Sequence, residues 1–349
     1  MSINVSLLKE ICEVAGTSGF EQAVRKLVLR EVEPFGLNTD IDNMGNLTVF
    51  KKGKADKRVM LAAHMDEIGF IVTHIDDRGF IKFHTIGGFD PKTLTAQRVI
   101  IHGKRDVIGV MGSKPVHLMS AEERSRNVVI QDFFIDTGLA PEEVRQLIEV
   151  GTPITRDRSL IEMGECVNCK SIDNRVSVFI LIELLRELQD VELPFDLYGV
   201  FTVQEEVGLR GVVAATQRIQ PDFAFCIDTT IAYDVPTAKP EEYTTKLGQG
   251  AAIKIMDGTV ICDHRMVSYM KQSANKHNIM WQLEILTAGG TDTAMQQRMT
   301  AGGSIAGAVS IPTRHIHQVI EMAHKKDIRA CIDLLKVCVA EMDTYDWAF

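Results

Sequence analysis

The sequence predicts an α/β protein: a mostly parallel, doubly wound sheet with helices on both faces, and a small β-rich domain inserted into the chain. Before residue 70 and after residue 165, unbroken apolar runs of strand length alternate with helical patterns. This is typical of strands buried on both sides of a parallel sheet. Between these regions, hairpin patterns replace the helices. The chain has 349 residues, enough for two domains at roughly 100–200 residues each. We assign residues 1–69 and 166–349 to one discontinuous α/β domain and residues 70–165 to the inserted domain.

The region before residue 70 begins with two predicted helices. Apolar side chains recur at helical spacing over residues 7–14. Ser18 and Glu21 have the spacing of a capping box and predict the start of the second helix. Residues 46–50 and 59–63 are short apolar runs and predict the first two strands.

The inserted domain is predicted to consist mainly of hairpins. Residues 70–75 and 80–84 flank one turn, and residues 99–102 and 107–110 flank another. In this region only residues 141–150 look helical.

The α/β alternation resumes near residue 171. An apolar helix is predicted at residues 176–188 and an amphipathic helix at residues 327–341. Strands are predicted at residues 197–203, 223–227 and 304–311. Because ligands bind outside the carboxyl ends of such strands, the residues that follow each strand are the first candidates for a functional site.

Charge and composition exclude several classes of function. The net charge is −9 and no cluster of Lys and Arg occurs, whereas sequence-independent nucleic-acid binding needs a basic face. No apolar run approaches the roughly 20 residues of a membrane helix, and the first residues lack the pattern of a signal peptide. We therefore expect a cytoplasmic protein that binds neither nucleic acid nor membranes. The seven Cys, including the isolated Cys166 and Cys169 pair, are expected to be reduced thiols.

Side chains that commonly bind metals follow every predicted strand of the sheet from residue 59 onward. They are His64 and Asp66 after residues 59–63, Glu205 and Glu206 after residues 197–203, Asp228 after residues 223–227, and His315 and His317 after residues 304–311. Each one alone is most simply a turn, cap or surface residue. Their coincidence at one sheet edge favours a shared cation. Imidazoles and carboxylates without thiolates suit Zn²⁺, Co²⁺ or Mn²⁺ better than Ca²⁺ or Mg²⁺, which prefer oxygen ligands.

Two pairs of neighbouring residues indicate distinct roles. His64 and Asp66 share a face in extended chain, so Asp66 can accept the second ring N–H of His64 and orient it. Glu205 and Glu206 are adjacent and point to opposite sides. One of them can therefore bind a metal while the other acts as general base on a metal-activated water.

Six segments together resemble the motifs of the tetrahedral aminopeptidases, dinuclear-metal peptidases that include glutamyl and deblocking aminopeptidases. The resemblance extends over nearly the whole chain. The segments are residues 64–69 (HMDEIG), 172–175 (IDNR), 204–211 (QEEVGLRG), Asp228 with residues 234–236 (DVP), 288–292 (AGGTD) and 311–317 (IPTRHIH).

The resemblance implies a role for each of seven side chains. Asp173, which would otherwise be read as a helix cap, would bridge two metal ions. His64 and Asp228 would bind one ion, and Glu206 and His317 the other. Glu205 would be the general base and Asp66 the partner that orients His64.

Two positions depart from the family pattern. Asn174 stands where many relatives have a second Asp, which leaves the bridging Asp173 in place. His315 stands where relatives often have Tyr and could compete for the metal, but His317 holds the family position.

The resemblance further implies a metal-dependent aminopeptidase that removes N-terminal residues from peptides, with two divalent ions, zinc or cobalt, per subunit. The inserted domain would correspond to the dimerisation domain of the family. A homo-oligomer is therefore expected. In the family, dimers assemble further into shells of twelve subunits.

Three alternatives remain open from the residues themselves. Another dinuclear amide hydrolase, a carboxypeptidase or deacylase, would have a similar metal site. A glycosidase could use Glu205 with a second carboxylate and no metal. A non-catalytic metal-binding protein would leave the Glu beside a ligand unexplained. A preference for acidic substrate side chains would need a cation near the ions, for which Arg210, Arg265 and Arg314 are candidates.

Overall fold

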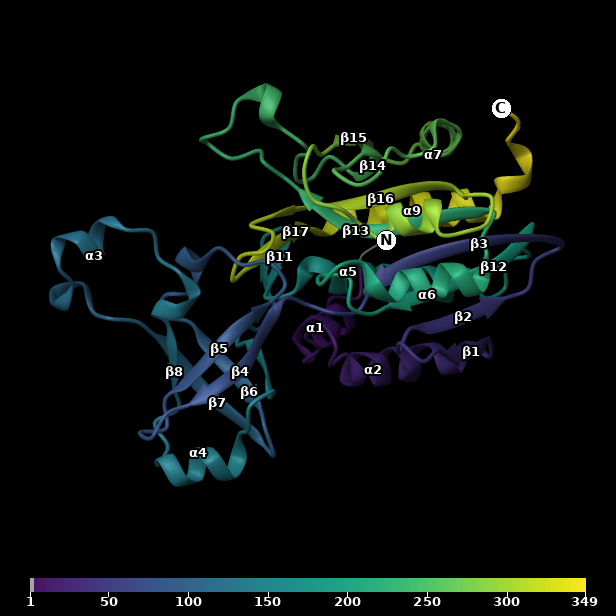
Figure 1. The fold of residues 1–349 in the computed structure, drawn as a ribbon. Coiled ribbons are helices and arrows are strands. Elements are labelled where there is room, and N and C mark those ends of the chain that lie inside the picture. Colours follow the sequence, from purple (N-terminus) through teal and green to yellow (C-terminus); the bar gives the residue numbers. More distant parts are fainter. Residues whose placement is uncertain (1–2) are drawn as a thin grey trace.

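Two β structures of different kinds make up the fold. The computed structural model describes residues 3–349. Figure 1 shows a large sheet flanked by helices, with a smaller barrel at its lower left. The chain enters the barrel after β3 and returns to the large sheet before β11.

Helices and strands account for most of the described chain. The helices are α1 (Val5–Glu13), α2 (Gln22–Val32), α3 (Ala121–Ser125), α4 (Pro141–Leu147), α5 (Ile172–Glu187), α6 (Arg210–Ile219), α7 (His264–Lys276), α8 (Thr293–Arg298) and α9 (Lys325–Ala340). The strands of the large sheet are β1 (Asn38–Ile41), β2 (Leu47–Lys51), β3 (Ala55–His64), β10 (Ile161–Met163), β11 (Cys166–Cys169), β12 (Phe195–Thr202), β13 (Phe223–Ile231), β14 (Ala251–Met256), β15 (Trp281–Ile285), β16 (Ile305–Arg314) and β17 (Glu321–His324). The strands of the barrel are β4 (Gly69–Ile75), β5 (Ile81–Ile86), β6 (Arg98–His102), β7 (Asp106–Gly112), β8 (Phe134–Asp136) and β9 (Pro153–Arg156).

The large sheet confirms the predicted fold class. Its main path runs β1-β2-β12-β3-β13-β16-β17-β11-β10, and β14 pairs with both β16 and β15. The four central strands β12, β3, β13 and β16 are parallel to one another. The neighbours on either side of this centre are antiparallel. Parallel pairing is thus concentrated where helices cover both faces, as expected for buried parallel strands.

The alternation of side chains along β3 shows how the two faces are covered. Val59, Leu61 and Ala63 point into the core formed with α1, α2, α5 and α9. Met60 and Ala62 point to the opposite face and pack with α6. This follows from the two-residue period of a strand. Both faces being buried explains why the strand reads as an unbroken apolar run.

The barrel closes in the order β4-β5-β8-β7-β6-β9. Its interior is filled by side chains such as Phe70, Ile101 and Ile135, and α4 contributes Val144. Its strands run from Gly69 to Arg156, whereas β10 pairs with β11 in the large sheet although it lies before residue 166. Figure 1 shows α3 on a segment that extends away from the barrel.

Some local predictions were wrong. Ser18 and Glu21 form no capping box: α2 begins at Gln22 with Glu21 as its N-cap and without a side-chain cap. Ser18 instead donates a hydrogen bond to Asp66. The helix α3 was also missed, because its five residues are mostly charged and exposed. No helix in the described residues is both long and apolar enough to span a bilayer.

The crevice expected at the carboxyl ends of the strands arises where β3 and β13 part. They pair only as far as Ala62 and Cys226. β13 continues beside β16 as far as Ile231. Asp228 therefore lies inside a strand, whereas the sequence predicted that it follows one. The last residue of β3 is His64. The two side chains therefore lie on opposite sides of the opening.

The turn after β12 depends on a close approach that only glycine permits. Gly211 donates a hydrogen bond to the Val203 carbonyl (3.0 Å) and accepts one from the Asn46 amide (2.9 Å). A Cβ atom at residue 211 would lie 2.4 Å from both the Val203 carbonyl oxygen and Asn46 Oδ1.

We predict that Gly211→Ala lowers the free energy of unfolding by about 1–3 kcal/mol, the usual cost of overpacking. The measurement is urea unfolding followed by circular dichroism. Gly302→Ala is the matched control, because a Cβ there has no heavy atom within 4 Å. Equal unfolding midpoints for the two variants would contradict the prediction.

Candidate functional site

A cavity of about 580 Å³ opens at the crevice between β3 and β13. The side chains predicted to bind metal, together with the predicted general base, line it. They are His64, Asp173, Glu205, Glu206, Asp228 and His317. The fold therefore brings together residues from five separate parts of the sequence.

Asp173 lies between the two imidazoles. Its Oδ1 atom is 3.4 Å from His64 Nε2, and its Oδ2 atom is 3.3 Å from His317 Nε2. Asp173 is at the start of α5, where the backbone at Asp173 and Asn174 is not yet helical. The two oxygens of one carboxylate thus face two different histidines.

The other carboxylates divide between the same two sides. Asp228 Oδ1 is 3.7 Å and Glu205 Oε2 is 3.8 Å from His64 Nε2. Glu206 Oε2 is 3.2 Å from His317 Nε2. The adjacent residues Glu205 and Glu206 therefore point toward different histidines. The chain here is a turn rather than the extended chain that the sequence suggested, with φ of +55° at Gln204 and hydrogen bonds from the N–H groups of Gly208 and Leu209 to the Glu205 carbonyl.

Asp66 connects several parts of the site from behind. Its Oδ1 atom is 3.3 Å from His64 Nδ1, the ring nitrogen that faces away from the carboxylates. Asp66 also accepts hydrogen bonds from the backbone N–H groups of Glu205 (3.1 Å) and Glu206 (3.2 Å). The Ser18 hydroxyl donates to it at 2.6 Å. His64 Nδ1 also lies 3.2 Å from the backbone carbonyl of Asp66. Asp66 thus orients His64 through both its carboxylate and its carbonyl, and its carboxylate positions the Glu pair.

The electrostatics of the site show an excess of negative charge. Burial raises the pKa of the Glu205 carboxyl well above its usual value, and the charge of Asp228 adds to this shift against the effect of His64. Burial likewise raises the pKa of Glu206 and of Asp228. Although burial alone would lower it, the charge of Glu206 and the contact with Asp173 raise the pKa of His317 to about 12. Each shift reflects carboxylates that lack sufficient positive charge.

The residues fit a divalent metal ion by their chemistry and spacing. Two groups have their ligand atoms within 4.8 Å of one another: His64 with Asp173 and Glu206, and His64 with Glu205 and Asp228. Glu206 Oε1 is buried and accepts no hydrogen bond from any residue in the described range 3–349. Imidazole and carboxylate donors suit zinc and similar transition ions. Neither group includes Cys166 or Cys169.

His315 and His317 occupy different environments. His317 contacts Asp173 and Glu206, and 42% of its side chain is exposed. His315 is exposed. Neither histidine belongs to the two groups of potential ligands, so the contacts of His317 with Asp173 and Glu206 are what distinguish it from His315. His64, by contrast, is only 2% exposed.

The sequence reasoning missed a buried cation in the cavity wall. Lys254 Nζ is 3.1 Å from Asp257 and 2.9 Å from Glu284, and Lys254 and Asp257 line the cavity. Lys254 lies in an apolar run that gave no signal of a site. The expected candidates Arg210, Arg265 and Arg314 do not line the cavity.

Asp292, which was noted only as part of a motif, also lies near the site. Burial raises its pKa to about 7, and its Oδ2 atom accepts a hydrogen bond from the Thr202 hydroxyl at 2.7 Å. Thr202 pairs with His64 across the two strands. Asp292 is therefore a further buried carboxyl near His64, and burial favours its neutral form.

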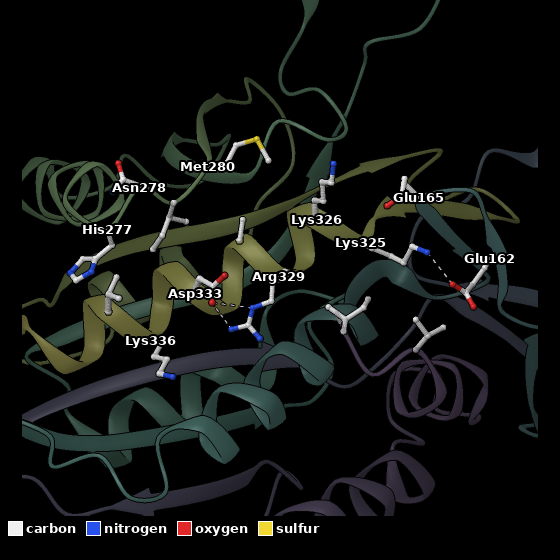
Figure 2. A pocket seen from close by; sticks show the side chains of 15 residues that line it. Glu162, Glu165, His277, Asn278, Met280, Lys325, Lys326, Arg329, Asp333 and Lys336 are labelled. Atoms are coloured by element: carbon white, nitrogen blue, oxygen red, sulfur yellow. Dashed lines mark hydrogen bonds and ion pairs between the residues drawn. The ribbon is translucent and has the colours of Figure 1, made fainter. Parts of the chain in front are cut away.

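A larger cavity, of about 830 Å³, runs along α9 (Figure 2). Its charged side chains are largely paired: Lys325 with Glu162 at 3.0 Å, and Arg329 with Asp333 at 2.5 Å. None of the potential metal-binding groups found in residues 3–349 lies there. Size alone therefore does not identify the functional site.

The chain is similar over nearly its full length to known aminopeptidases. The sequence profile of the M42 glutamyl aminopeptidase family matches residues 45–334. A putative aminopeptidase of Acetivibrio thermocellus is 38% identical over 330 residues, which are 94% of this chain and 96% of the relative. The crystal structure of the TET aminopeptidase from the marine sediment archaeon Thaumarchaeota archaeon SCGC AB-539-E09 superposes with a TM-score of 0.94 at 34% identity, covering 97% of this chain and 96% of that one. The TET1 peptidase of Pyrococcus horikoshii, which can assemble into a tetrahedron or a large octahedral shell, has a TM-score of 0.87 at 31% identity and covers 97% and 99%.

We predict that His317→Ala weakens the binding of one divalent ion, because we expect His317 to be a direct ligand. The dissociation constant should rise by more than the roughly 10–100-fold that is typical when a residue that only supports a ligand is lost. The measurement is the amount of Zn²⁺ or Co²⁺ retained per chain after dialysis. His315→Ala is the matched control and should retain the wild-type amount. Loss of metal in the His315 variant alone would reverse the assignment.

Proposed function

The chain belongs to the M42 glutamyl aminopeptidase family and is an aminopeptidase, and from this premise we propose how its residues remove N-terminal residues from peptides. In this proposal, Glu205 is the general base and Asp66 orients His64. Two divalent ions are held by His64, Asp173, Glu206, Asp228 and His317.

The position of Asp173 carries the proposal. Its two oxygens lie 3.4 Å and 3.3 Å from imidazole nitrogens on opposite sides. Asp228 lies on the His64 side and Glu206 on the His317 side. This is the arrangement needed for one carboxylate to bridge two ions, each with its own imidazole and its own further carboxylate.

Zinc or cobalt suits this set of ligands, and bound ions would supply a Lewis acid that polarises the peptide carbonyl and lowers the pKa of water. Residues of the chain itself must carry out the proton transfers. A group must accept a proton from the attacking water and return it to the leaving amine.

Glu205 has the properties of that proton carrier. It lines the cavity, and its Oε2 atom is 3.8 Å from His64 Nε2. Because burial raises the pKa of Glu205, its carboxyl holds a proton more readily than an exposed Glu, which suits a group that both accepts and donates a proton near neutral pH. Asp66 fixes Glu205 through its backbone N–H (3.1 Å).

The carboxylate that binds no ion in this proposal supports recognition of a free N-terminus. Glu205 lines the cavity, and a protonated substrate amine is attracted to a negative charge there. A carboxypeptidase would have to accept a substrate carboxylate in this cavity, and a deacylase would have to accept a blocked amine.

A homo-oligomer is the expected assembly. The TET1 relative forms shells, and the barrel of this chain exposes apolar side chains that could pack against a second copy. They are Ile108 and Val110 on β7, and Val116, Leu118, Val128 and Val129 on the segment around α3. Such exposed apolar groups are typical of protein interfaces. We therefore propose that residues 70–165 form a dimerisation domain and that dimers assemble further, to a dodecamer in the case of a tetrahedral shell.

We also propose a cytoplasmic location. All seven Cys are free thiols in the structure, which suits a reducing compartment.

We predict that Glu205→Gln lowers turnover of peptide substrates by about 10²–10⁴-fold, the usual effect of losing an acid–base group. The metal content should stay at the wild-type value, because Gln replaces a group that is not a ligand in this proposal. Glu206→Gln is the matched control and should lose metal as well as turnover. Unchanged turnover in the Glu205 variant would exclude it as the general base.

We further predict that the chain hydrolyses an aminoacyl arylamide at least about 100-fold faster than its N-acetyl analogue, because a site that pairs with a charged amine rejects a ligand lacking it. The measurement is kcat/KM on metal-stripped protein refilled with Zn²⁺ or Co²⁺. Chelation should abolish the activity. Equal rates of arylamine release from both substrates would exclude recognition of the free amine, and release of acetate from the N-acetyl analogue would favour a deacylase.

A further inference from the structure

A second set of charged side chains is buried directly behind the candidate metal site. Glu67 follows Asp66 in the sequence and is fully buried. Its carboxylate contacts Lys170 Nζ, lies 3.3 Å from Arg175 and 3.7 Å from Arg156. Glu321, also fully buried, lies 3.8 Å from Arg156. Arg156 is thus the cation that approaches both carboxylates.

Arg156 differs from the other two cations in its place in the fold. Lys170 and Arg175 flank Asp173 in the sequence, and Arg175 donates to backbone carbonyls of the N-terminal segment, including those of Ile11 and Val14 at 2.8 Å. Arg156 instead ends strand β9 of the barrel. Its side chain is 1% exposed and its guanidinium lies 5.6 Å from the ring centroid of Phe89, also in the barrel region. Arg156 is therefore a barrel residue that reaches into the α/β part.

One contact of Arg156 leads to His317. Its Nη1 donates to the carbonyl of Gln318 at 2.6 Å, and Gln318 follows His317 directly. The backbone at His317 has φ of +56°, a conformation that a residue with a side chain keeps only when its surroundings hold it. Arg156 anchors the residue next to this bend.

The other contact leads to Asp173. Glu321 Oε2 accepts a hydrogen bond from the Asp173 backbone N–H at 2.8 Å. Glu321 Oε1 has no hydrogen-bond partner among the described residues and faces the Arg156 guanidinium at 3.8 Å. Among the described residues Arg156 is the cation within 4 Å of the Glu321 carboxylate. Its loss would leave this carboxylate buried beside Asp173 without its ion-pair partner, an arrangement that is strongly unfavourable.

We propose that Arg156 is a positioning residue for the metal site, which holds Asp173 in place through Glu321 and His317 in place through Gln318. The inference rests on the metal-binding role proposed above for Asp173 and His317. It implies that the barrel, besides any role in assembly, helps to preorganise the ligand set. Partners of this kind typically change metal affinity by about 10–100-fold when removed.

The test compares metal binding, independently of activity, in Arg156→Met and Arg156→Lys. Metal-stripped proteins are titrated with Co²⁺, and the visible absorption of bound Co²⁺ gives both the dissociation constants and the geometry of the site. Arg156→Met should weaken the binding of at least one ion by about 10–100-fold. Arg156→Lys keeps a charge for Glu67 and Glu321, so it should fold even if the Met variant does not. It cannot reproduce the planar set of donors, and should therefore also bind Co²⁺ more weakly, with an altered spectrum.

Arg98→Met is the matched control. Arg98 is also in the barrel and forms an ion pair at 3.3 Å with Asp157, the residue after Arg156, but its side chain is 64% exposed. This variant should bind Co²⁺ as the wild type does. Wild-type dissociation constants and spectrum in a folded Arg156 variant, or an equal loss of affinity in Arg98→Met, would overturn the inference. If the wild-type protein itself bound no Co²⁺, the proposed function would fail first, which keeps the two failures distinguishable.

Discussion

Repulsion among buried carboxylates is the constraint on which the rest of the site depends. Asp173, Glu205, Glu206 and Asp228 line one crevice, and burial raises the pKa of the last three. A fold that gathers them must supply positive charge or lose stability. On the open side, His64 and His317 lie against the carboxylates, and the proposed divalent ions would complete the balance. On the closed side, the charge of Glu67 is balanced by Lys170, Arg175 and Arg156. Arg156 also balances the charge of Glu321.

The sheet makes this concentration of charge possible. The parallel central strands point their carboxyl ends to the same edge of the sheet, and β13 remains paired with β16 beyond the point at which it parts from β3. The gap admits side chains from both strands and from the turn after β12. Asp66 then uses hydrogen bonds to two successive backbone N–H groups to set the direction of the Glu pair. Sheet geometry places the residues, and local hydrogen bonds orient them.

The sequence could predict what depends on local pattern. Apolar runs predicted the central strands, and the residues that follow them, His64, the Glu pair and His317, line one cavity in the structure. Asp173 was found only through family resemblance, because it opens a helix rather than ending a strand. β1 was missed because all four of its residues are exposed. Ser18 was assigned to a helix cap because its spacing to Glu21 is right, while its actual partner is 48 residues away. Glu321 was not noticed, since its contact with Asp173 spans 148 residues.

The unequal exposure of the two histidines, 2% for His64 and 42% for His317, has a kinetic consequence. Weakly packed, exposed residues open locally at a lower free energy than packed ones, so an ion held by His317 would exchange faster than one held by His64. The ion near His317 would then exchange with free ions in solution, while the ion near His64 would be retained. Under scarce supply, such chains would pass through a half-loaded form, and mixed loading with two different elements would be a natural result.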